Sequence, residues 1–126
     1  MSRWIFAAVV ALWAVMLPIH SIMIATALLI GADLVMGVWA SRKRGETFRV
    51  STALHRTIVK MAVFQVCVVT AFLIQTWLLP VVPIVKLVAG IIAITEGSSV
   101  LENAGTVLGQ PVFAVVLSKL KSQNDK

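Results

Sequence analysis

The chain has 126 residues, of which 60% are hydrophobic and 13% charged, and its mean hydropathy is +0.98. Soluble domains have about 45–50% apolar and about 25% charged residues, and so short a chain has little interior for an excess. Lipid must therefore cover much of its surface. A single cysteine and two histidines exclude a disulfide framework and disfavour a metal or cofactor enzyme. The net charge of +6 does not favour nucleic-acid binding, because the basic residues flank apolar segments.

The N-terminal apolar stretch is too long for one membrane-spanning helix. Within residues 4–40 the only charged residue is Asp33. As a single helix this stretch would be about 55 Å long, nearly twice a hydrocarbon core of about 30 Å. Pro18 removes a backbone donor and is the expected break. We therefore expect a first segment at about 4–17 and a full span at about 19–41. The first segment is only about 21 Å long and either crosses the bilayer or inserts partly.

A cleaved signal peptide is the alternative for this N-terminus. Arg3 precedes the apolar run, and the Ala-Thr-Ala sequence at residues 25–27 resembles a cleavage site. Because the apolar run continues to Gly31 and beyond, cleavage there would cut through a spanning helix. We therefore expect both segments to be retained.

A basic loop follows the second segment, at residues 42–60. Its basic residues are Arg42, Lys43, Arg44, Arg49, Arg56 and Lys60. The only acidic residue among them is Glu46. Such an excess of basic residues beside apolar segments predicts that the loop faces the cytoplasm. Anionic lipid headgroups are the expected partner there, contributing about 1 kcal/mol per basic residue near the surface.

Two further spans are expected at about 61–79 and 84–108, joined by a proline-containing turn. The chain is thus predicted to be an all-α integral membrane helical bundle with three to four transmembrane helices, covering residues 1–110. Residues 111–126 should form a short C-terminal amphipathic helix and a tail. This multi-pass topology places the C-terminus in the cytoplasm, on the same side as the basic loop. The simplest topology has both termini inside. If the first segment does not cross the bilayer, the N-terminus lies outside or in the interface.

Several polar residues interrupt the apolar segments. A carboxylate at mid-bilayer costs roughly 2.5–3.5 kcal/mol unless it is protonated, paired or hydrated. At about 100° per residue, most of the polar residues of the last span share one stripe. Glu102 lies just outside this stripe, where Arg56 or Lys60 could reach it. The candidate interface or pore-lining residues are Asp33, Gly37, Glu96, Ser99, Glu102, Asn103 and Thr106. They either form helix–helix contacts or line water after self-association.

No arrangement of residues supports catalysis or cofactor binding. The chain has no glycine-rich phosphate loop, no HExxH motif and no Ser/His/Asp set in an accessible context. We therefore expect no enzyme activity, no metal and no cofactor.

Two blocks of sequence carry a family resemblance. The first is an Asp-x-x-x-Gly pattern at Asp33 and Gly37, just before the basic loop. The second is a Glu-x-x-Ser-x-x-Glu-Asn pattern that starts at Glu96 and ends at Asn103, followed by Gly-x-Pro and an amphipathic tail. Together these blocks resemble the toxin-secretion/phage-lysis holin family over roughly residues 33–121.

The resemblance implies a function. Holins accumulate in the bacterial cytoplasmic membrane, form homo-oligomers and open lesions that release a cell-wall hydrolase or a toxin. The partners that it implies are the lipid bilayer, further copies of the chain and a functionally paired hydrolase or toxin. Two alternatives stay open: a non-pore structural or assembly subunit of a membrane complex, and a small narrow channel component.

Overall fold

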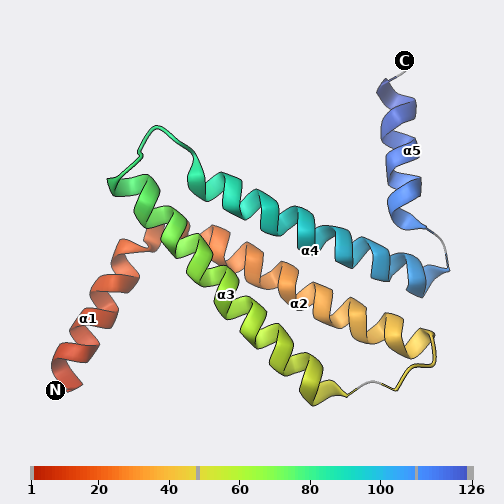
Figure 1. Cartoon of the computed structure of the whole chain (residues 1–126), viewed down its shortest axis with the longest axis horizontal. Helices are drawn as coiled ribbons and strands as arrows, with labels where there is room; N and C mark the ends of the chain where they lie inside the picture. The colour runs from red at the N-terminus through yellow and green to blue at the C-terminus, as the bar shows by residue number, and fades with distance from the viewer. Residues whose placement is uncertain (1, 48, 110, 125–126) are drawn as a thin grey trace.

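The computed structural model describes residues 2–47, 49–109 and 111–124, and over these residues the fold is all-α. Three long helices lie side by side, with a shorter helix at each end of the chain (Figure 1). The elements in chain order are α1 (Ser2–Val15), the 3₁₀ turn η1 (Leu17–Ile19), α2 (His20–Lys43), α3 (Val50–Trp77), α4 (Ile84–Leu108) and α5 (Val112–Asn124).

The three long helices form a membrane-spanning bundle. The apolar stretches Leu17–Lys43, Val50–Trp77 and Ile84–Leu108 have 27, 28 and 25 residues. At 1.5 Å per residue each α-helix is about 36–42 Å long, more than a hydrocarbon core of about 30 Å. α2 and α4 run in the same direction and α3 runs against them, and α2 packs more extensively on α4 than α3 packs on either. The predicted fold class, a membrane helical bundle, is confirmed.

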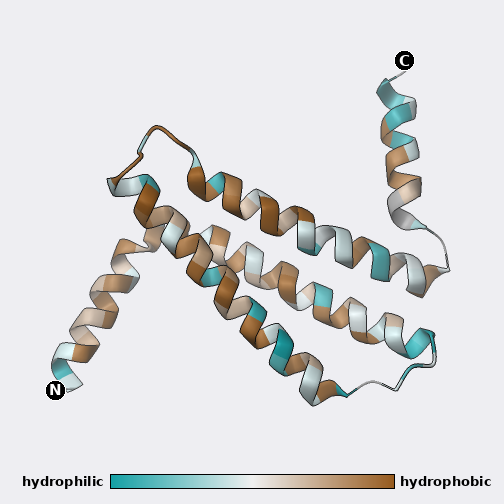
Figure 2. Ribbon diagram, viewed as in Figure 1, coloured by the Kyte–Doolittle hydropathy of each residue, from teal (hydrophilic) through white to brown (hydrophobic). Residues whose placement is uncertain are grey.

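The two ends of the bundle differ in polarity. One end holds the end of α2, the start of α3 and the end of α4, and we call it the basic end. Figure 2 shows hydrophilic residues concentrated in this half of the three helices, and hydrophobic residues dominating the other half. At the opposite end α2 begins and a turn at residues 78–83 joins α3 to α4.

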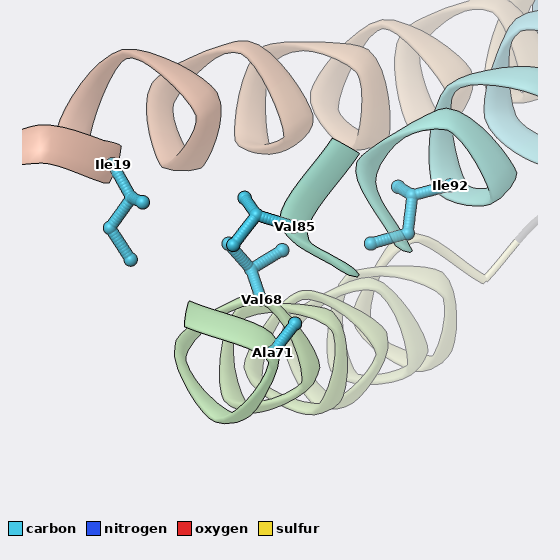
Figure 3. Close-up of a cluster of buried hydrophobic side chains, with 5 residues drawn as sticks. All are labelled: Ile19, Val68, Ala71, Val85 and Ile92. Atoms are coloured by element: carbon cyan, nitrogen blue, oxygen red, sulfur yellow. The ribbon is translucent and has the colours of Figure 1, made fainter. Parts of the chain in front are cut away.

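The apolar core lies toward the opposite end. Its buried residues, Ile19, Val68, Ala71, Val85 and Ile92, point toward one another from the start of α2 and from α3 and α4 (Figure 3). Many large apolar side chains on the outside of the helices are exposed instead. This pattern is typical of a protein surrounded by lipid, because burying an apolar side chain gains little free energy when the surrounding lipid is itself apolar.

Helix α1 stands apart from the bundle. None of its residues is buried, and it projects outward from the start of α2, at the opposite end of the bundle (Figure 1). The helical run is interrupted between α1 and α2 at η1, which contains Pro18. This interruption is expected, because proline has no backbone N–H to donate. With 14 residues α1 falls short of the three candidate spans.

Helix α3 begins much earlier than the sequence predicted. It starts at Val50, whereas the hydropathy pattern placed its start at Met61. The expected loop at 42–60 was therefore wrong in its second half, and Arg56 and Lys60 lie on the helix. The physical reason is that residues 50–60 contain no glycine or proline, so backbone hydrogen bonding continues where the side chains become polar.

Helix α4 ends at Leu108 and is capped by Gly109, which has a φ of +68°. This left-handed conformation suits glycine and closes the last helical turn, with the Gly109 N–H directed to carbonyl oxygens of the preceding turn. Pro111 then separates α4 from α5, and α5 leaves at a steep angle to the bundle (Figure 1).

Candidate functional site

One charged residue from each long helix meets in the middle of the bundle. Asp33 comes from α2, Lys60 from α3 and Glu96 from α4. The Lys60 ammonium donates to Asp33 Oδ2 at 3.0 Å and to Glu96 Oε2 at 2.9 Å. We call these three residues the charge triad. A single cation thus joins two carboxylates and ties all three helices together.

The charge triad lies deep in the bundle. Glu96 is 2% exposed, and it sits about 18 Å from either end of α4 at 1.5 Å per residue. Asp33 and Lys60 each lie about 15 Å from the basic end of their helices. Their side chains are 15% and 34% exposed. Charges at this depth are costly in a bilayer, so their mutual pairing is what makes their placement tolerable.

The pairing within the triad is uneven. Two carboxylates share one ammonium, and Asp33 Oδ1 is buried without a hydrogen-bond partner among the described residues. Removing one partner of a buried ion pair costs about 3–5 kcal/mol, because the other charge is left unpaired. Lys60 is therefore the residue on which the other two depend.

Helical periodicity explains why Asp33 points inward. Thr26, Ile30 and Ala40 are the buried residues of α2 near it, and Asp33 and Gly37 fall between them at spacings of three or four. Residues at these spacings share one face of a helix. Asp33 therefore belongs to the face that α2 turns toward its neighbours.

Close packing of α2 on α4 continues this face toward the basic end. A Cβ built on Gly37 would lie 3.7 Å from Asn103 Nδ2, which is ordinary van der Waals contact. Small residues allow helices to approach closely in membranes, where apolar burial contributes little. Gly37 and Asn103 thus face each other across the α2–α4 contact.

A polar groove of about 320 Å³ runs from the basic end to the charge triad. Four of the residues proposed from the sequence line it, namely Asp33, Gly37, Ser99 and Asn103. Arg56 of α3 lines it as well, as do other residues of α2 and α3. Asp33 is the member of the triad that this groove reaches.

Glu102 and Thr106 lie apart from this arrangement. Glu102 is exposed, and within the described part of the chain it forms no ion pair. Of the two residues that could have reached Glu102, Lys60 pairs with Asp33 and Glu96 instead, and Arg56 forms no ion pair with it among the described residues. Thr106 donates its hydroxyl hydrogen to the Glu102 carbonyl of its own helix at 3.3 Å. A pore-lining or subunit-interface role for these residues stays a prediction.

Sequence reasoning named Lys60 only as a residue of the basic loop, so its place in the charge triad was missed. A signal was present in the spacing: Lys60, Phe64, Val68 and Ala71 fall on one face of a helix. Of these, Val68 and Ala71 are buried and Phe64 packs on the core. Continuing that helix toward the N-terminus would have placed Lys60 inward.

Two glutamines of α3 make further polar contacts between the helices. Gln65 Nε2 donates to the Met23 carbonyl and to Thr26 Oγ1, both at 3.1 Å. Near the other end of α3, Gln75 Oε1 accepts the N–H of Val85 at 2.9 Å, at the start of α4. These contacts hold α3 to α2 and to α4 without placing further charge in the bundle.

Four other residues of the predicted basic loop lie at the basic end itself. Arg42 and Lys43 end α2, and Arg49 precedes α3. In the intervening loop Arg44 Nε donates to Glu46 Oε1 at 2.9 Å, and the Ser41 hydroxyl donates to Glu46 Oε2 at 3.1 Å. The hydrogen bond from Arg44 is the main cause that holds the pKa of Glu46 below its ordinary value.

The chemistry of the site is charge pairing. Lys60 and the two carboxylates bind one another. They are not arranged to transfer a proton to a substrate. Among the residues described, no group of three or more His, Cys, Asp and Glu side chains could hold a metal ion.

Comparison with known protein families identifies a match. The sequence profile of the bacteriophage holin family matches residues 10–124, from within α1 to the end of α5. This range includes the whole charge triad and the polar groove. No curated protein and no solved structure matches the chain.

Proposed function

Because the chain belongs to the bacteriophage holin family, we propose that it oligomerises in the bacterial cytoplasmic membrane and permeabilises it. The cargo released would be a cell-wall hydrolase or a toxin. The family is one of non-enzymatic membrane proteins, and the three long apolar helices make the chain a multi-pass membrane protein. The observation that carries the proposal is the family match over nearly the whole chain.

The charge distribution supports an orientation with the basic end in the cytoplasm. Arg42, Lys43, Arg44 and Arg49 cluster at that end. At the opposite end Lys86 is the basic residue near the start of α4. The positive-inside rule favours the basic end inside, and α5, with Lys119 and Lys121, begins there too. Three crossings then place α1 and the N-terminus at the outer face.

The size of the polar groove supports oligomerisation. The groove of one chain has a volume of only about 320 Å³. A folded enzyme of about 150 residues has a radius of gyration near 15 Å, so it needs a lumen more than about 30 Å wide. One three-helix bundle cannot enclose such a lumen. Many copies, with polar faces turned toward water and apolar faces toward lipid, can surround one.

Helix α5 suits a position along the membrane surface. Its apolar residues include Leu117 and Leu120, and Lys119 and Lys121 supply positive charge. Such a helix binds anionic headgroups through its lysines while its apolar side chains enter the interface.

Expression in a bacterium that also holds a cytosolic muralytic enzyme tests the proposal. We expect growth to stop and the cells to lyse, whereas without the enzyme the membrane potential should collapse with little lysis. Inserted protein that leaves growth and potential unchanged would contradict the proposal.

Purified protein in liposomes separates the alternatives. A holin should release an entrapped folded protein. Release of ions alone would indicate a narrow channel, and release of neither would indicate a structural subunit.

A further inference from the structure

We propose that the charge triad of Asp33, Lys60 and Glu96 is the switch that sets when a chain opens. In the closed bundle the three charges satisfy one another, and in the open state water takes over that role. The inference rests on the proposed function, since it concerns the regulation of the same permeabilising unit.

The triad has two ways to satisfy its charges. In a dry bundle, Lys60 must pair with both carboxylates, at 3.0 and 2.9 Å, because nothing else compensates them. In a water-filled lumen each charge is hydrated and the attraction between them is weak. The same three residues therefore favour the closed bundle while it is dry and stop favouring it once water enters.

The packing identifies α3 as the helix that moves. α2 and α4 pack extensively on each other, while α3 makes fewer contacts with either. The apolar core joins α3 to its neighbours mainly toward the opposite end, through Val68 and Ala71 (Figure 3). Toward the basic end α3 lies farther from α4 (Figure 1), and there Lys60 links it to both neighbours.

The polar groove provides the route by which water reaches the triad. It extends from the basic end to Asp33 and is lined on its way by Arg56, Ser99 and Asn103. Asp33 Oδ1 accepts no hydrogen bond from the described residues, so it offers a free acceptor to a water molecule entering the groove. With all three groups ionised the triad also has one negative charge in excess, which hydration stabilises.

Replacing Lys60→Met tests the switch. This change keeps the long side chain but leaves Asp33 and Glu96 unpaired. The closed state of each chain should be disfavoured by on the order of 100-fold. Cells should therefore lyse at a lower amount of inserted protein than with the wild type. Lys86→Met is the matched control, because Lys86 is exposed at the opposite end and its loss should leave that threshold unchanged.

A neutral triple variant keeps the test decisive if Lys60→Met folds poorly. Asp33→Asn, Lys60→Met and Glu96→Gln together preserve the shapes and remove every charge of the triad. Exchanging a buried ion cluster for neutral groups is often harmless to folding. We expect the triple variant to insert like the wild type but to lyse late or not at all, because hydration no longer favours opening.

A labelling experiment separates failure of the switch from failure of the proposed function. In a Cys67→Ser background, Ser99→Cys reports whether water reaches the groove, and it needs no lesion. Lys60→Met should raise the labelling rate at this position and the neutral triple variant should lower it. Wild-type rates and wild-type lysis thresholds in both variants would overturn the switch. Wild-type lysis timing in the triple variant, even if Lys60→Met is degraded, would also overturn it. Absence of any release by the wild type would refute the proposed function instead.

Discussion

The ammonium of Lys60 lies 2.9 Å from a carboxylate oxygen of Glu96, although the two residues stand on different helices in the middle of the bundle. Because the same ammonium also holds Asp33 at 3.0 Å, the three members of the triad differ in importance. Losing Lys60 leaves two carboxylates without a cation, whereas losing Glu96 leaves a balanced pair of Lys60 and Asp33.

This asymmetry predicts the stability of single variants. Lys60→Met should lower the stability of the folded bundle by about 3 kcal/mol or more, since it breaks two buried pairs at once. Glu96→Gln should cost about 1 kcal/mol, because the amide can still accept a hydrogen bond from Lys60. Thermal unfolding of the purified variants in detergent micelles measures both. Equal destabilisation by the two changes would contradict this ranking.

The number and order of the long helices could be predicted from the sequence, because a span surrounded by lipid must be both apolar and helical. The boundary at Met61 was wrong for a related reason. Hydropathy indicates where a helix enters lipid, whereas backbone hydrogen bonding in α3 begins at Val50. The break before α2 was predictable, because Pro18 has a known local effect.

The candidate site was predictable only in part. Asp33 and Glu96 stand out because ionisable residues are rare in apolar segments, and the structure brings both to one cation. Their partner was missed once Lys60 was assigned to a loop. Contacts such as Gln65 with Thr26 depend on how each helix is rotated against its neighbour, and periodicity along one helix does not supply that rotation.

The contact between Gly37 and Asn103 predicts a size limit at the α2–α4 contact. Gly37→Ala should be tolerated, because its Cβ would lie 3.7 Å from Asn103 Nδ2. Gly37→Leu should destabilise the bundle by about 1–3 kcal/mol, because a larger side chain forces the helices apart. Thermal unfolding in micelles again measures the change.

Gly31→Leu is the control for this effect. Gly31 lies on the same helix, and a Cβ there would meet nothing within 4 Å. Because leucine is a better helix former than glycine, Gly31→Leu should not destabilise the bundle. A loss of stability at Gly31 as large as at Gly37 would therefore mean that the effect does not come from packing on α4.

The loop at the basic end predicts a titration. The hydrogen bond from Arg44 lowers the pKa of Glu46 from its ordinary 4.5. The Glu46 carboxylate therefore stays ionised and paired at pH 4.5, and the ion pair is lost as the pH falls through the lowered pKa. A carbon-detected NMR titration in micelles should therefore find the Glu46 midpoint below 4.5. Arg44→Gln should move the midpoint back upward. A wild-type midpoint at or above the ordinary value would show that the pair does not persist.

The basic residues around the loop predict the orientation of the whole chain. In a Cys67→Ser background, cysteines placed at Ser51 and Ser122 should resist an impermeant thiol reagent on intact spheroplasts until a lesion opens, because both lie at the basic end or beyond it in α5. A cysteine at Val81, which is 92% exposed in the turn at the opposite end, should react at once. After the membrane is permeabilised by detergent all three should react, which shows that each is accessible. Early modification at Ser51 together with protection at Val81 would show that the basic end faces outward and would contradict the proposed orientation.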